Sequence, residues 1–136
     1  MAVNIDGGCY CGQIKYRAEV DPAKVEICHC TDCQTLSGSA YRTAVPADAD
    51  SFELLCGSPK FYAKTAEDGS KRLQAFCPEC GSPLYSAPPA GETGYFGIRV
   101  GTTNQRDMLV PQKQYWARSA QLWTQDLSGM VKIETE

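Results

Sequence analysis

The residues of this chain best suited to chemistry are its cysteines, most of which lie in short motifs. Seven of the eight fall into three groups, Cys9-Tyr-Cys11, Cys28-His-Cys30-Thr-Asp-Cys33 and Cys77-Pro-Glu-Cys80, while Cys56 stands alone. A chain of 136 residues can bury its own core and does not need disulfides to hold it together. Because the N-terminus shows no secretory signal, we expect a reducing compartment, where clustered cysteines are more often metal ligands or catalytic groups.

The first and third motifs together predict a structural zinc site. The pair Cys77 and Cys80 is typical of a zinc knuckle, in which a tight turn directs two sulfurs at one ion. Structural zinc takes four ligands, so two more are needed. A CxC pair in an extended chain points both sulfurs to one side, and we therefore expect Cys9 and Cys11 to complete the site.

The middle motif predicts a second zinc site of a different kind. In an extended segment Cys28 and Cys30 face the same side, and Cys33 returns toward them from the start of a short helix. Three protein ligands with one position open are typical of catalytic rather than structural zinc. We therefore expect Cys28, Cys30 and Cys33 to be the catalytic ligands.

Other interpretations of these motifs remain open. His29 could be a fourth ligand, but in a strand it points away from the neighbouring cysteines, which favours packing or a hydrogen bond on the other face. Cys56 could close the second site, although a small buried hydrophobic residue is the commoner state of a lone cysteine. A redox function of Cys77 and Cys80 would require a βαβ context that the sequence lacks.

The elements that must position these motifs are predicted to be mostly β-strands. Apolar and polar residues alternate over 12–20, as in a half-buried strand. Similar short runs, mostly separated by turn residues, lie at 24–29, 39–46, 51–55, 59–64, 71–76, 83–87 and 95–100. No repeat or linker divides the chain, so we expect a mainly β fold, an antiparallel meander forming a single domain over 1–136.

One short helix is expected inside the middle motif. Thr31 and Gln34 have the spacing of a capping box, and Gly38 is placed to end the helix. Cys33 would lie in the first turn, where backbone N–H groups and the helix dipole favour a thiolate. We therefore expect the pKa of Cys33 to lie below that of a free cysteine.

Composition and charge argue against several classes of partner. The net charge of −3 and the pI near 5.2 leave no basic stripe for phosphates, so neither nucleic acid nor an anionic membrane is expected as a partner. No segment approaches the roughly 20 apolar residues of a membrane-spanning helix. We expect a cytoplasmic protein that acts on small molecules.

The order of the motifs resembles one known family. Read together, GGCYCGQIKYRA, CHCTDCQTLSGSAYRT, FCPECGSPLY and PQKQYWARSAQLW are similar to the GFA family, glutathione-dependent formaldehyde-activating enzyme and its relatives, which share a domain with centromere protein V. The resemblance runs from about residue 5 to residue 123. It implies a β-tent fold with two zinc ions, a structural one on Cys9, Cys11, Cys77 and Cys80 and a catalytic one on Cys28, Cys30 and Cys33.

The resemblance also implies an activity, the condensation of glutathione with formaldehyde to S-(hydroxymethyl)glutathione, classed as a carbon–sulfur lyase reaction. A thiol co-substrate, glutathione or a similar one, would occupy the open zinc position as a thiolate and attack formaldehyde or another small aldehyde. Three thiolates leave Zn²⁺ with a net charge of about −1, which weakens it as a Lewis acid and disfavours a hydrolase. The competing hypothesis is a non-catalytic zinc-binding module with a binding or chaperone-like function.

Substrate-contacting groups can be named only as candidates. The cations that could meet the carboxylates of glutathione are Arg42, Lys60, Lys71 and Arg99. Tyr41 or Tyr62 could line the pocket. Charged residues on strands are more often simply solvated, so the four cations are candidates only. Trp116 and Trp123 are expected to pack in the core or at its rim.

Overall fold

The computed structural model describes residues 1–136 and contains ten strands and one α-helix. The strands are β1 (Val3–Gly8), β2 (Lys15–Val20), β3 (Glu26–Cys28), β4 (Arg42–Asp48), β5 (Glu53–Cys56), β6 (Lys60–Thr65), β7 (Lys71–Phe76), β8 (Pro83–Ala87), β9 (Tyr95–Arg99) and β10 (Lys113–Tyr115). The α-helix is α1 (Thr31–Ser37). Short 3₁₀ helices are η1 (Pro22–Lys24), η2 (Ala49–Ser51), η3 (Val100–Thr102), η4 (Arg106–Met108), η5 (Ala117–Ser119) and η6 (Leu122–Gln125).

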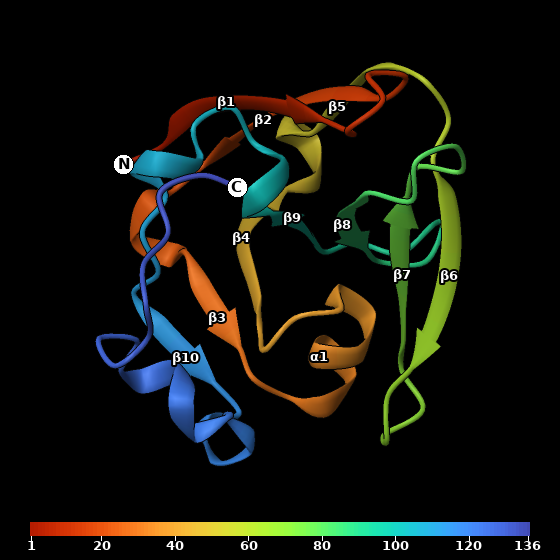
Figure 1. Cartoon of the computed structure of the whole chain (residues 1–136). Coiled ribbons are helices and arrows are strands. Elements are labelled where there is room, and N and C mark those ends of the chain that lie inside the picture. Colours follow the sequence, from red (N-terminus) through yellow and green to blue (C-terminus); the bar gives the residue numbers. More distant parts are fainter.

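The strands form one sheet in the order β1-β2-β4-β9-β8-β7-β6, with β5 added to β2, and β3 added to β4 (Figure 1). Pairing is antiparallel throughout, except that β10 lies parallel to β3. The mainly β prediction is therefore confirmed, but the simple meander is wrong. Strand β4 pairs with β9 over five residues, from Ala44 opposite Arg99 to Asp48 opposite Tyr95, and this pairing departs from hairpin order.

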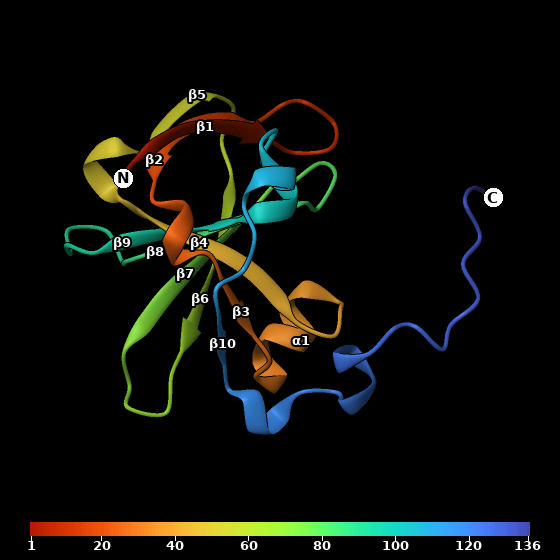
Figure 2. The ribbon, with the colours of Figure 1, turned by 90° about the vertical axis from the view of Figure 1, so that its left-hand side faces the viewer.

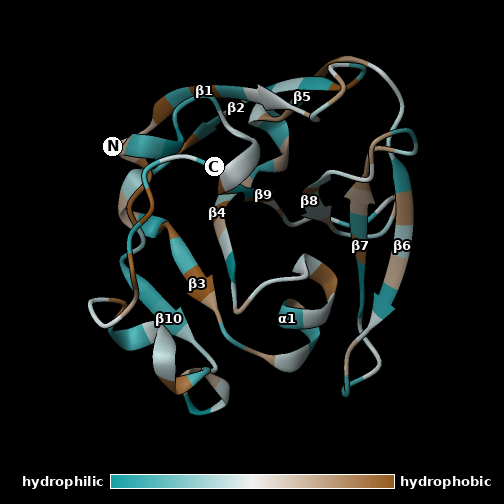
Figure 3. Cartoon of the chain, viewed as in Figure 1, coloured by the Kyte–Doolittle hydropathy of each residue, from teal (hydrophilic) through white to brown (hydrophobic).

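The core lies on one face of the central strands. Val45 of β4 and Ile98 of β9 are paired in register and fully buried. An aromatic group packs beside them, in which the ring centroid of Phe52 lies 4.6 Å from that of Tyr85 and 4.5 Å from that of Phe96. Because side chains alternate along a strand, the residues next to Val45 in β4 and next to Ile98 in β9 face the opposite side of the sheet. Figure 3 shows this alternation of hydrophobic and hydrophilic residues along β7.

Most predicted strand ranges hold, and two match the observed bounds. The ranges 71–76 and 83–87 are β7 and β8. The range 12–20 begins too early because Gly12 has a φ of +85° in the turn before β2, which starts at Lys15. Strands β1 and β10 were not predicted, since β1 ends in two glycines and β10 has only three residues.

The segment after η6, residues 126–136, does not join the sheet. After η6 it runs away from the body of the protein without regular structure (Figure 2). Trp116 and Trp123 are each about half exposed, so they lie at the rim and not in the core. The guanidinium of Arg118 lies 5.0 Å from the centroid of the Trp116 ring. No helix of the structure has the length and apolar character needed to cross a bilayer.

Gly7 allows β1 to approach the chain after β9, and this contact gives a test of the fold. A Cβ at Gly7 would lie 2.7 Å from the Tyr16 hydroxyl and closer still to the Thr102 carbonyl oxygen. We expect Gly7→Ala to lower the free energy of unfolding by about 1–3 kcal/mol, as overpacking does. Gly101→Ala is the control, because a Cβ there meets nothing within 4 Å. Urea unfolding measures both, and equal stability of the two variants would contradict the packing described.

Candidate metal centres and the adjoining cavity

Four cysteines from two distant hairpin turns converge in the structure. The sulfurs of Cys9, Cys11, Cys77 and Cys80 all lie within 4.8 Å of one another. The Cys11 sulfur is 3.6 Å from that of Cys9 and 3.7 Å from that of Cys77. Sulfurs placed tetrahedrally at about 2.3 Å from zinc would be about 3.8 Å apart, whereas a disulfide bond measures about 2 Å. The spacing therefore fits a zinc ion and not a pair of disulfides.

A tight turn between β1 and β2 positions the first two sulfurs. The Cys9 N–H donates to the Ile14 carbonyl at 3.0 Å, and the Gly12 N–H donates to the Cys9 carbonyl at 3.2 Å. The Ile14 N–H donates to the Cys9 sulfur at 3.2 Å. The expectation that Cys9 and Cys11 lie in extended chain is therefore wrong, because the hairpin reverses at these residues.

The turn between β7 and β8 has the form of the predicted knuckle. The Cys77 N–H donates to the Ser82 carbonyl at 3.0 Å, and Gly81 closes the turn with a φ of +77°. The N–H groups of Glu79 and Cys80 lie 3.4 and 3.5 Å from the Cys77 sulfur. Hydrogen bonds from Ser82 lower the pKa of Cys80 to about 5. A thiolate supported by backbone donors is the form in which cysteine binds metal.

The middle motif forms a second and smaller group of sulfurs. Those of Cys28, Cys30 and Cys33 lie within 4.8 Å of one another, and no other cysteine, histidine or carboxylate joins them. Cys28 ends β3, Cys30 precedes α1, and Cys33 is buried in its first turn. The donor set is soft and has three members, which fits zinc with one position left for a further ligand.

The start of α1 differs from the predicted capping box. The cap is Cys30, whose sulfur accepts from the Cys33 N–H at 3.2 Å, and Thr31 is already helical. The Gln34 amide donates instead to the His29 carbonyl at 2.8 Å, which ties the helix to the preceding segment. The predicted end is confirmed, since Gly38 caps the helix with a φ of +67°.

The acidity of Cys33 is the reverse of the expectation. Burial raises the pKa of Cys33, and hydrogen bonds with Cys30 and Cys28 raise it further. Burial also acts to raise the pKa of Cys30, but hydrogen bonds from the Cys33 side chain and N–H outweigh it and lower that pKa. The N-terminus of the helix therefore favours the thiolate of Cys30, while Cys33 lies too deep to gain from it.

His29 and Cys56 lie outside both sulfur groups. His29 is buried, its Nε2 lies 2.8 Å from Oε1 of Gln114 on β10, and its ring packs edge-on against Tyr41. Its predicted hydrogen bond away from the cysteines is confirmed. The expectation of a buried Cys56 is wrong, because β5 is exposed along its whole length and the Cys56 thiol donates to the Gln13 carbonyl at 3.4 Å.

A cavity of about 200 Å³ adjoins Cys28 and Cys33, and strand register explains its lining. Cys28 is opposite Arg42, Ala44 is opposite Arg99, and Gly97 is opposite Ser86, so one face of β3, β4, β9 and β8 contributes. Strands β7 and β6 continue this face. The cationic residues that line the cavity are Arg42, Lys64, Arg72 and Arg99.

Only part of this lining was predicted. Arg42 and Arg99 line the cavity as expected, whereas Lys60 and Lys71 do not. Tyr62 lines a neighbouring cavity of about 170 Å³, which shares both arginines, while Tyr41 lies on the other side against His29.

The sequence interpretation missed Lys64 and Arg72, which face each other across β6 and β7. Lys64 pairs with Asp32 of α1 at 3.0 Å. Arg72 donates to the Tyr95 carbonyl at 2.6 Å and to Ser86 Oγ at 3.2 Å. Like charges at directly opposite positions are destabilising, and this pair can be recognised only when the register is known.

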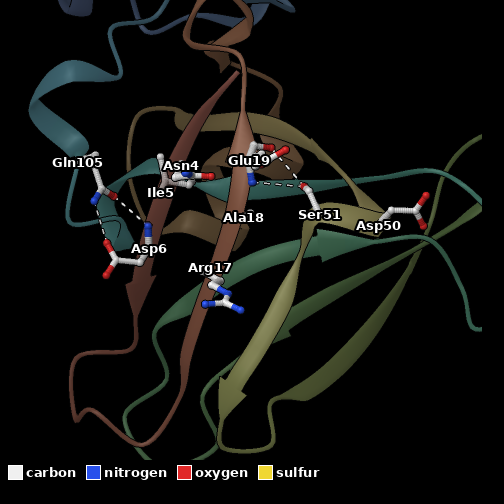
Figure 4. Close-up of a pocket in the computed structure, with 9 residues that line it drawn as sticks. All are labelled: Asn4, Ile5, Asp6, Arg17, Ala18, Glu19, Asp50, Ser51 and Gln105. Carbon is white, nitrogen blue, oxygen red and sulfur yellow. Dashed lines mark hydrogen bonds between the residues drawn. The ribbon is translucent and has the colours of Figure 1, made fainter. Parts of the chain in front are cut away.

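A larger hollow on the surface involves neither cysteine group. It lies across β1 and β2 beside η2, and several of its polar groups are hydrogen bonded to one another (Figure 4). Gln105 Nε2 donates to Asp6 at 2.8 Å, and Ser51 donates to the Glu19 carbonyl at 3.3 Å. Arg17 forms an ion pair with Glu53 at 2.7 Å. The hollow therefore contains no group of cysteine or histidine ligands, and several of its polar groups already have partners.

Comparisons with known proteins identify the family of the chain. A Schizosaccharomyces pombe protein named as an uncharacterized lyase is 25% identical over 91 residues, which are 67% of this chain and 63% of that protein. A crystal structure of a Rhodobacter sphaeroides protein has the same fold, with a TM-score of 0.60 at 18% identity, and covers 80% of this chain and 98% of its own. The sequence model of the family described as glutathione-dependent formaldehyde-activating enzyme matches residues 4–119, and the chain therefore belongs to the GFA family.

Proposed function

We propose that this protein is a zinc-dependent carbon–sulfur lyase of the GFA type. It condenses glutathione or a similar thiol with formaldehyde or another small aldehyde. The observation that carries the proposal is the group of three cysteine sulfurs that no other protein ligand joins and that borders a cavity. Family membership and the relative named as a lyase support the same class of activity.

The two groups of cysteines would have different functions. Cys9, Cys11, Cys77 and Cys80 would hold a structural zinc, and Cys28, Cys30 and Cys33 a catalytic one. Zinc at the second group would supply the positive charge that stabilises a substrate thiolate at neutral pH. In the condensation, the thiol sulfur bonds to the aldehyde carbon, the carbonyl π bond breaks, and the thiol proton ends on the new hydroxyl.

The chain's own residues support this chemistry in two ways. The Cys33 N–H donates to the Cys30 sulfur at 3.2 Å, a contact that would support the Cys30 thiolate as a zinc ligand. The register of β3 and β4 keeps the substrate cavity against Cys28. The substrates of this proposal are small molecules, a thiol and an aldehyde.

The proposal includes the wider organisation of the protein. Residues 1–136 would form one GFA-type domain, a β-tent braced by the four-cysteine zinc. The domain would act in the cytoplasm without nucleic acid or a membrane as partner, as the net charge of −3 favours.

Metal analysis tests the division of the cysteines. We expect two zinc ions per chain in reduced protein, and one in either Cys77→Ser or Cys28→Ser. Cys77→Ser should also lower the midpoint of thermal unfolding, because Cys77 is fully buried and joins two hairpins, whereas Cys28→Ser should leave that midpoint near wild type. Cys56→Ser is the matched control and should retain both ions.

Plasma mass spectrometry and thermal unfolding measure these outcomes. Fewer than two zinc ions in carefully reduced protein, or full retention of metal by Cys28→Ser, would refute the division into a four-cysteine and a three-cysteine site.

Thiol binding and turnover test the activity. On adding glutathione to the zinc-loaded protein, zinc-edge absorption should show the mean sulfur coordination rising as a fourth sulfur joins the three-cysteine site. Exchange between ¹³C-formaldehyde and S-(hydroxymethyl)glutathione, followed by NMR, should be faster with wild type than without protein. It should return to the uncatalysed rate with Cys28→Ser and remain fast with Cys56→Ser. Unchanged coordination and unchanged exchange would favour a non-catalytic zinc-binding module.

A further inference from the structure

The cavity beside Cys28 and Cys33 contains more positive charge than its own residues neutralise. Four cations line it against a single carboxylate, that of Glu26. Lys64 is paired with Asp32, and no ion pair joins Glu26 to any of the arginines. Arg72 is held by three hydrogen bonds to Ser86 and Tyr95 and lies over the Tyr95 ring, with its guanidinium carbon 4.1 Å from the centroid. Arg42, Arg72 and Arg99 form no ion pair with a carboxylate.

Arg99 is the most buried of these three arginines, at 9% exposed, and its hydrogen-bond partners are neutral. Its Nη1 donates to the Gly97 carbonyl at 3.1 Å and its Nη2 to the Gln74 side-chain oxygen at 2.7 Å. Arg42 makes no hydrogen bond and no ion pair through its side chain. Burying a charge without an opposite one is unfavourable, so an anion in this cavity would stabilise the pair.

Arg99 makes its hydrogen bonds at the side of the cavity away from Cys28. Its contact with Gln74 places the guanidinium toward β7, whereas Cys28 lies on β3 at the other side of β4. Arg42 is the direct cross-strand neighbour of Cys28, and the charge of Cys33 acts on both Arg42 and Arg99. The cavity therefore extends from the sulfurs along a row of two arginines. Gly97 keeps this row open, because a Cβ there would lie 2.7 Å from Ser86 Oγ and 3.7 Å from Arg99 Nη1.

The size of the cavity limits what can occupy it. At about 200 Å³ it is smaller than the roughly 300–1,000 Å³ of sites for drug-sized ligands. A compound of few heavy atoms fits, whereas a tripeptide thiol such as glutathione would also have to extend into the neighbouring cavity of about 170 Å³ that shares both arginines. Guanidinium groups bind carboxylates through paired, charge-assisted hydrogen bonds.

We propose that Arg42 and Arg99 bind the carboxylate of a short mercapto acid, or of its aldehyde adduct, whose sulfur lies at the three-cysteine site. This inference rests on the proposed function, because it requires a thiol at Cys28, Cys30 and Cys33. It adds the substrate class and makes the two arginines the residues that determine specificity.

The test compares two thiols that differ only in charge, 3-mercaptopropionate and 3-mercaptopropionamide. Calorimetric titration of reduced, zinc-loaded protein should show the carboxylate form binding about tenfold or more tightly than the amide, as expected for a charge-assisted pair. Arg99→Gln and Arg42→Gln should each remove most of this preference while changing the affinity for the amide by less than about twofold. Arg17→Gln is the control, because Arg17 is an exposed arginine paired with Glu53 outside the cavity.

Each other outcome overturns a stated part of the proposal. If the arginine variants lose affinity equally for both thiols, the two arginines support the cysteine site and the proposed carboxylate site is wrong. If neither thiol binds, the proposed function fails, and titration with propionate then decides the anion site by itself. If propionate binds and Arg42→Gln weakens that binding, the anion site is supported. If propionate does not bind, the anion site is rejected.

Two further measurements check the folding of the variants and the size of the substrate. Because Arg99 is buried, circular dichroism must show that Arg99→Gln is folded, and Arg42→Gln, at a less buried position, provides an independent answer. Glutathione is titrated in parallel. If it binds about tenfold or more tightly than 3-mercaptopropionate with the same dependence on arginine, the carboxylate is one end of glutathione and the short substrate is wrong.

Discussion

The antiparallel pairing of β4 with β9 is the contact on which the arrangement of the site depends. It joins segments about fifty residues apart and places Val45 opposite Ile98 in the core. Since the side chains of a strand alternate, fixing this buried pair also fixes Ala44 and Arg99 on the other face. A shift of one residue would exchange the two faces, so the register that forms the core also forms the cavity.

The cysteine pairs use hairpin turns to impose a second constraint. Cys9 and Cys11 lie between β1 and β2, and Cys77 and Cys80 lie between β7 and β8. Two other strands, β4 and β9, separate these hairpins in the sheet order, yet their sulfurs meet. The sheet must therefore bend strongly, as the course from β1 to β7 in Figure 1 shows. The same curvature brings β6 and β7 opposite α1, where Lys64 reaches Asp32.

Sequence reasoning succeeds where the determinants are local and fails where they depend on register. Motif spacing is sufficient to divide seven cysteines into the two groups that converge in space. Gly38 ends the helix because it adopts the left-handed conformation, which glycine allows without steric cost. Cys56 is misplaced because burial depends on which strands cover β5, and the pKa of Cys33 is misjudged because burial opposes the helix dipole. Arg72 has no local signal at all, since only pairing with β6 and β8 brings it to the cavity.

The charges of the cavity contrast with those elsewhere in the protein. On the surface, Arg17 lies opposite Glu53 in the pairing of β2 with β5 and forms an ion pair with it, a favourable cross-strand arrangement. In the cavity, Lys64 lies opposite Arg72, and Arg99 is buried against neutral oxygens. Both arrangements reduce stability when they are considered alone. Both arrangements occur in the same cavity, beside the group of three cysteines. An anion bound in this cavity would offset the loss of stability that they cause.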